Sequence, residues 1–186
     1  MGPWCILLGQ GGIKWGKVGQ SSAKTPKKYA KMEQSEQLFY FRERRMLLGE
    51  YQHTLDTKGR VTIPAKLRGE LAAGLVVTRG FDQNLVAYPL SEWEVIATKI
   101  MQQPISDRNS RDFRRRFFAN ATDVVPDRQG RILLPANLRE FAGIGTDVVI
   151  TGMFDHIELW SKELWTAVHD DVANNDDAAR WQGLGI

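Results

Sequence analysis

The pattern of apolar and polar residues changes at Met46. Residues 1–45 are rich in Gly and Lys and show no sustained period of two or 3.6 residues, so they present no apolar face that a core could bury. Over 47–168, short apolar runs alternate with turn signals, which is typical of a domain built from short strands. The sequence therefore predicts disorder over 1–45 and a folded domain after it.

The folded region contains an internal repeat. The segment 56–68 reads DTKGRVTIPAKLR and lies 71 residues before 127–139, which reads DRQGRILLPANLR. After one residue of slippage the match continues at a spacing of 72, for example between Tyr88 and Trp160. The chain therefore holds two copies of one unit. We place these copies at 50–93 and 121–165.

Each unit predicts the same series of elements. Its Asp-x-x-Gly sequence is a turn signal, because Asp accepts hydrogen bonds from the backbone ahead of it and Gly tolerates positive φ. Alternating apolar residues then predict a half-buried strand, and the Pro that follows suits the first turn of a short helix. These positions are Val61, Ile63 and Pro64 in the first unit and Ile132, Leu134 and Pro135 in the second. Two more strands follow at 75–78 and 85–88, and at 147–151 and 157–160.

Helical patterns flank the units. Ser91, with Glu94 three residues later, forms a capping-box pattern at the start of a helix that runs to about Gln102. Further helices are predicted over 107–120 and 161–169. We assign 94–120 to a helical linker, and 166–186 to the end of the last helix and an acidic tail.

A single unit of about 43 residues buries too little apolar surface to be stable alone. We therefore expect the two units to intertwine, which would bring the cations of both turns onto one surface. A two-stranded β-ribbon fits the DNA major groove, and Arg can bind guanine through two hydrogen bonds. The candidate DNA-binding residues are Lys58, Arg60, Arg128 and Arg131.

Plainer interpretations stand beside this one. Each turn Arg can instead form an ion pair with the Asp of its own turn, although recurrence in both units favours a role on DNA. The arginines of 107–120 fit an exposed or interface helix face as well as they fit phosphate contacts. Arg68 and Arg139, on the short helices, are interpreted as holding the fold or a contact between subunits.

The net charge narrows the DNA interpretation. The chain of 186 residues has 25 Lys and Arg against 22 Asp and Glu, which gives a net charge of +3. Residues 1–45 hold nine Lys or Arg and three Glu, a net +6, which leaves −3 for the rest of the chain. DNA binding must therefore rest on local clusters of cations.

Other classes of function find little support. Cys5 is the single cysteine, so the chain can form no internal disulfide. The three His lack the spacing of metal ligands, and no nucleophile motif or phosphate-binding glycine loop occurs. No apolar run approaches the roughly 20 residues of a membrane helix. We therefore expect a cytoplasmic protein that has no cofactor, no small-molecule substrate and no catalytic activity.

These motifs together resemble those of the MraZ family. The resemblance is carried by the doubled Asp-x-x-Gly-Arg unit, the run YPLSEW at 88–93 and the Arg-rich helix, and it covers 47–168. It implies a mainly β fold with helices (α+β), in which two AbrB-like (SpoVT-AbrB) half-barrels form one intramolecular, pseudo-dimeric, swapped-hairpin β-barrel with flanking helices. The DNA-contacting arginine of the family corresponds to Arg60 and Arg131, and we add Lys58 and Arg128 as charged neighbours in the turns.

The same resemblance implies a function. It indicates a sequence-specific, DNA-binding regulator of transcription, a repressor of the division and cell-wall gene cluster. Its partners would be double-stranded DNA with G-rich direct repeats ahead of its own gene, and further copies of itself in a ring-shaped homo-oligomer on the nucleoid. The alternative is an AbrB-like oligomeric scaffold or an antitoxin-type protein that reads no operator.

Chains of this family begin near Met46, so residues 1–45 are expected to be a leader translated from an upstream start codon. The codons of Trp15-Gly16 must then contain TGGG, and those of Leu8-Gly9, Gly11-Gly12 and Val18-Gly19 permit it at intervals of ten nucleotides. Ten base pairs is about one turn of B-DNA. We hypothesise that this segment is the operator read as protein.

Overall fold

The structure is a computed structural model that describes residues 4–9, 12–17 and 46–174. The chain divides into two compact units, Met1–Arg44 and Arg45–Ile186. In the first unit, strand β1 (Trp4–Gly9) pairs antiparallel with β2 (Gly12–Lys17).

These two strands differ from the disorder predicted for 1–45. Each contains β-favouring apolar residues, such as Ile6 in β1 and Ile13 in β2. A two-residue connection lets the strands pair locally, without the larger core that the Gly and Lys content seemed to exclude. The rest of the prediction, over 18–45, lies outside the described residues.

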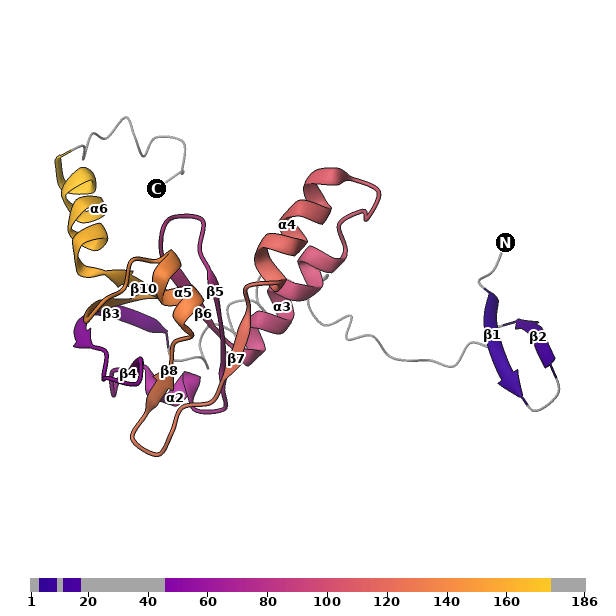
Figure 1. The fold of residues 1–186 in the computed structure, drawn as a ribbon, viewed down its shortest axis with the longest axis horizontal. Helices are drawn as coiled ribbons and strands as arrows, with labels where there is room; N and C mark the ends of the chain where they lie inside the picture. The colour runs from indigo at the N-terminus through magenta and orange to yellow at the C-terminus, as the bar shows by residue number, and fades with distance from the viewer. Residues whose placement is uncertain (1–3, 10–11, 18–45, 175–186) are drawn as a thin grey trace, which may run out of the picture. The chain divides into compact units, whose positions relative to one another are not determined.

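The second unit is built on a six-stranded antiparallel sheet and a separate two-stranded ribbon. Along the sheet the order is β3-β9-β10-β6-β5-β7. The bounds are β3 (Leu47–Thr54), β5 (Leu75–Arg79), β6 (Leu85–Pro89), β7 (Thr122–Val124), β9 (Asp147–Phe154) and β10 (Ile157–Ser161). The ribbon pairs β4 (Arg60–Thr62) with β8 (Arg131–Leu133), and lies beside the sheet in Figure 1.

The strand order shows that the two repeats exchange strands. The first strand of each repeat pairs with the other repeat, since β3 lies beside β9 and β7 beside β5. The remaining contacts between repeats, β4 with β8 and β6 with β10, join equivalent strands. The intertwining and the α+β class are confirmed. Strand pairing among residues 46–174 ends at β3 and β7, so the hydrogen-bonded order is open rather than a closed ring.

Five helices complete the described part of this unit. They are α2 (Arg68–Leu71), α3 (Leu90–Met101), α4 (Arg108–Phe118), α5 (Ala136–Phe141) and α6 (Lys162–Asn174). In Figure 1, α3 and α4 form a pair on one side of the sheet and α6 lies on the other. None of the helices described is long and apolar enough to cross a membrane.

The helix starts test the capping signals. Asp107 caps α4 by accepting a hydrogen bond from Ser110 N at 2.7 Å, and Ser161 Oγ accepts one from Leu164 N at 3.3 Å. The Ser91 capping box is wrong: α3 begins at Leu90, directly after Pro89, with no side-chain cap. Pro89 has a φ of −50° and a ψ of 147°, which is not helical, so the helix begins directly after it, one residue before the serine.

The core is filled equally by both repeats. Val61 and Ile132 face each other across the β4–β8 ribbon and are fully buried. Side chains on adjacent positions of a strand point to opposite faces. Arg60, Thr62, Arg131 and Leu133 therefore share the outer face of this ribbon.

This assignment of faces predicts a contrast between two neighbouring residues. Ile132→Ala is expected to lower the free energy of unfolding by about 2–5 kcal/mol, because removing a fully buried side chain leaves a cavity. Leu133→Ala is expected to change it by less than about 0.5 kcal/mol, because that side chain lies at the surface. Urea unfolding followed by circular dichroism measures both values. Similar losses for the two variants would contradict the assignment.

Candidate nucleic-acid interface

The two Asp-x-x-Gly turns have the same backbone conformation. In the first, Gly59 N donates to Asp56 O and Asp56 N donates to Arg60 O, both at 2.9 Å. The equivalent bonds of the second turn are 2.8 and 2.9 Å. Gly59 and Gly130 both have φ of +75°, a conformation that side chains with a Cβ rarely adopt. The sequence repeat therefore encodes a repeated local structure.

Each turn Asp holds the Arg that follows it. Asp56 Oδ1 accepts hydrogen bonds from the backbone N of Lys58 and Arg60, at 2.9 and 3.0 Å. Asp56 Oδ2 accepts from Arg60 Nε at 2.7 Å and lies 2.6 Å from Nη2. In the second turn, Asp127 Oδ2 accepts from Arg131 Nε at 2.8 Å and lies 2.7 Å from Nη2. These bonds, led by those from the arginine side chains, lower the pKa of both carboxyl groups to about 2.

The ion pair expected under the plainer interpretation is therefore present, and it leaves part of each guanidinium available. Asp contacts only the edge formed by Nε and Nη2. A guanidinium has five N–H donors, so Nη1 and the second hydrogen of Nη2 can still form a forked pair. The side chains of Arg60 and Arg131 are each 29% exposed. Each Arg thus combines a fixed position with a donor edge that no residue of 46–174 occupies.

The ribbon brings these two arginines together. Arg60 lies opposite Leu133 and Arg131 lies opposite Thr62, so the arginines are diagonal neighbours on one face. Diagonal neighbours in an antiparallel pair are about 7–8 Å apart. Because β4 and β8 run antiparallel, the turns that carry Lys58 and Arg128 lie at opposite ends of the ribbon, where both residues are exposed.

Each turn is also braced by an Arg from the other repeat. The side chain of Arg68 packs against Gly130, and that of Arg139 packs against Gly59. The contacts are so close that a Cβ atom at Gly130 would lie 2.5 Å from Arg68 Nε, and one at Gly59 would lie 3.1 Å from Arg139 Nε. Arg68 Nε donates to the Ile63 carbonyl oxygen at 2.8 Å, and Arg139 Nε makes the equivalent bond at 3.0 Å. The two arginines therefore hold the fold around the turns, which is one of the two roles that the sequence left open.

The arginines of α4 are largely committed to the fold. The side chains of Arg111, Arg114 and Arg116 donate to backbone carbonyls of the last residue of α3, of the α3–α4 connection or of the β5–β6 turn. Both remaining arginines form ion pairs with Asp112: Arg108 Nε lies 3.6 Å from its Oδ2, and Arg115 Nη1 lies 2.7 Å from its Oδ1. Hydrogen bonds to the chain's own backbone thus explain three of these five arginines without any phosphate.

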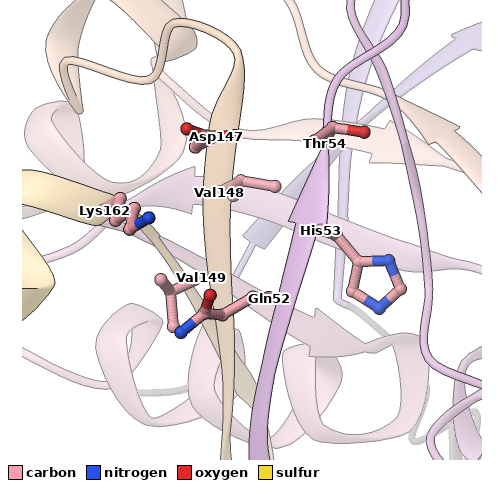
Figure 2. A pocket seen from close by; sticks show the side chains of 7 residues that line it. All are labelled: Gln52, His53, Thr54, Asp147, Val148, Val149 and Lys162. Carbon is pink, nitrogen blue, oxygen red and sulfur yellow. The ribbon is translucent and has the colours of Figure 1, made fainter.

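A second surface feature is a hollow of about 340 Å³ between β3, β9 and the start of α6. Figure 2 shows Gln52 and Lys162 on one side of it, with the His53 ring directed to the other side of β3. Burial, and then the charge of Arg68, lower the pKa of His53. Within the described residues, no three His, Cys, Asp or Glu side chains are grouped to hold a metal ion. The β4–β8 ribbon is therefore the better candidate for a binding surface.

Comparison with known proteins assigns the chain to a family. The model of the family described as "MraZ protein, putative antitoxin-like" matches residues 46–116 and again 117–182. The chain belongs to the MraZ family. The repeated match agrees with the duplicated unit, and the matched residues include both turns of the ribbon.

Several relatives are named "Transcriptional regulator MraZ". The protein from Herpetosiphon aurantiacus is 52% identical over 133 residues, which span 72% of this chain and 93% of that protein. The protein from Thermoanaerobacter pseudethanolicus is 47% identical over 134 residues, 72% of this chain and 91% of that protein. The protein from Clostridium beijerinckii is 44% identical over 142 residues, 76% of this chain and all of that protein. MraZ proteins are thus a family of transcriptional regulators, which is not a class of enzymes.

Thr62 and Leu133 complete the outer face of the ribbon and were not among the predicted site residues. The signal that could have found them is the alternation along the strand. Once Ile132 and Leu134 are assigned inward, Leu133 must point outward, onto the face that also holds Arg131.

The Asp-Arg turns predict a stability change at acid pH. A carboxyl group whose pKa is about 2 in the folded chain stabilises it above the ordinary pKa near 4, and this contribution is lost as the pH falls towards 2. The free energy of unfolding of the unaltered protein should therefore fall more steeply between about pH 4 and pH 2 than that of the variant with Asp56→Asn and Asp127→Asn. Urea unfolding at each pH measures both slopes.

Asp82→Asn is the control for this comparison, because it removes one charge from an exposed turn outside the ribbon. It should retain the steep slope. Parallel curves for the unaltered protein and the double variant would show that the turn carboxylates do not stabilise the fold as described.

Proposed function

We propose that this chain regulates transcription by binding double-stranded DNA through the outer face of its β4–β8 ribbon. Arg60 and Arg131 would contact guanines in the major groove, and Lys58 and Arg128 would contact phosphates at the two ends. The observation that carries this proposal is the placement of two Asp-held arginines on one face, each with a free donor edge.

The geometry suits a guanine run. A two-stranded ribbon fits the major groove, where guanine presents O6 and N7 as a pair of acceptors. The diagonal spacing of Arg60 and Arg131, about 7–8 Å, is roughly two base-pair steps of 3.4 Å. Both arginines can therefore reach guanines of the same short G-rich box. Because Asp holds each guanidinium before DNA arrives, less side-chain freedom is lost on binding.

The target proposed here is a set of G-rich direct repeats ahead of the chain's own gene. Repression of the division and cell-wall gene cluster, and association with the nucleoid, belong to the same proposal. A ribbon with few cations, on a chain whose residues outside 1–45 carry a net charge of −3, would bind one box weakly. Several linked copies would bind a row of boxes much more tightly.

We also propose that the chain assembles into a ring of identical copies. The two repeats differ in how their flanking helices are covered. On α3, the ring of Trp93 stacks on the ring of Phe117 of α4, with 4.9 Å between the ring centroids. The equivalent Trp165 of α6 contacts Trp160, with 5.9 Å between the ring centroids, and α6 has no buried residue. A second copy can supply the cover that α4 supplies on the first repeat, and such head-to-tail contacts generate rings when they close.

The arginines provide the direct test of DNA binding. Arg60→Ala and Arg131→Ala are each expected to weaken binding to a G-rich box by about 1–3 kcal/mol, the value of one forked contact with guanine. The double variant should lose specific binding. Gel-shift titration against a G-rich repeat and a scrambled duplex measures these losses, and light scattering reports the assembly.

Arg108→Ala is the matched control, because its side chain is 87% exposed on α4 and the same charge is removed. It should bind as the unaltered protein does. Unchanged affinity in the double variant, with assembly intact, would favour the scaffold or antitoxin-type alternative over operator reading.

The spacing of the boxes tests the joint action of several copies. Inserting five base pairs between two boxes turns the second to the opposite side of the helix, whereas ten restore its direction. We therefore expect five to abolish the gain in affinity from the second box and ten to retain most of it. Equal effects of the two insertions in a gel-shift titration would contradict binding by one rigid assembly.

A further inference from the structure

The outer face of the ribbon holds one exposed apolar side chain beside its two arginines. Leu133 is 52% exposed, whereas its strand neighbours Ile132 and Leu134 are fully buried. It lies directly opposite Arg60 and shares its face with Arg131. At this position the leucine keeps about half of its surface exposed and lies beside both arginines that are proposed to read DNA.

The chemistry of the major groove indicates what such a side chain contacts. Its base edges present hydrogen-bond donors and acceptors and a single kind of apolar group, the C5-methyl of thymine. Residues directly opposite in an antiparallel pair have Cβ atoms about 4.5–5.5 Å apart, and neighbouring base pairs are about 3.4 Å apart. A guanine bound by Arg60 therefore places Leu133 over an adjacent base pair.

We propose that Leu133 is a specificity-determining residue that packs on the methyl group of a thymine next to the guanine bound by Arg60. This inference rests on the proposed function. Thr62, which lies opposite Arg131 in the same relation, offers a smaller methyl contact at the equivalent position.

The difference between Leu133 and Thr62 also bears on the form of the target. The ribbon backbone has near two-fold symmetry, and a symmetric reader matches a palindrome. Here the two halves present different outer side chains, and the turns differ too, with Lys58 in one and Gln129 at the equivalent place in the other. The ribbon thus suits a box that reads differently in its two directions, as a direct repeat does.

The test removes the methyl group from the DNA and the side chain from the protein. Replacing a thymine that flanks the guanine run by deoxyuridine deletes only the methyl. The unaltered protein should bind the deoxyuridine duplex about three- to fivefold more weakly, the effect of burying one such group. Leu133→Ala should bind the thymine duplex with a similar loss and should no longer distinguish the two duplexes. Fluorescence anisotropy with both duplexes measures this cycle.

Two further variants sharpen the outcome. Leu48→Ala removes a leucine that is 50% exposed and lies on β3, outside the ribbon, and it should keep the full preference for thymine. Leu133→Thr installs the side chain of the opposite repeat and should keep part of that preference. It also provides a measurable variant where Leu133→Ala binds too weakly.

Three results would overturn the inference. The first is a full preference for thymine in Leu133→Ala and Leu133→Thr, and the second is the same affinity of the unaltered protein for both duplexes. The third is dissociation of the assembly by Leu133→Ala in light scattering, which would place this leucine between copies. If Arg60→Ala and Arg131→Ala still abolish specific binding, such results remove only the role of Leu133. If those variants bind normally, the proposed function fails and the inference fails with it.

Discussion

The pairing of β4 with β8 is the contact on which the rest of the folded unit depends. Val61 and Ile132 meet across it, fully buried, so each repeat supplies half of a core that neither could close alone. The ladder continues at both ends, where Ile63 N donates to Gly130 O at 2.8 Å and Leu134 N donates to Gly59 O at 3.0 Å. Because each strand has only three residues, burial and these flanking bonds must act together to keep the strands in register.

The same register determines the surface. A slip of one residue would turn Val61 outward and move Arg60 into the core, so the cost of exposing one and burying the other holds the pairing in place. The antiparallel direction then sets the two arginines diagonally on one face. Asp56 and Asp127 in the turns hold the guanidinium groups of Arg60 and Arg131. Arg68 and Arg139 pack against the turn of the opposite repeat. Core packing and the candidate interface are thus two consequences of one pairing.

Duplication has given this chain a nearly symmetric scaffold with unequal surfaces. Replacing each strand by its counterpart in the other repeat gives the same strand order read from the opposite edge, and both turns have equivalent hydrogen bonds. The differences lie where side chains meet solvent, as with Leu133 and Thr62 on the ribbon, or where α4 covers α3 while no helix among residues 46–174 covers α6 in the same way. A backbone that must close a shared core tolerates little change, whereas outward positions are free to diverge.

The sequence by itself determined the features that depend on nearby residues. The Asp-x-x-Gly turns, the alternation that buries Val61 and Ile132, and the duplication were all readable, because turn chemistry and strand periodicity are local. Only the tertiary structure decided which strands pair, since periodicity does not name a partner, and β3 lies beside β9 of the other repeat. It also decided how α4 arginines are used: Arg114 and Arg116 donate to backbone carbonyls of Met101 and Gly80, which folding brings near them. A cation's role depends on which acceptors the fold places within reach, and that is a long-range property of the chain.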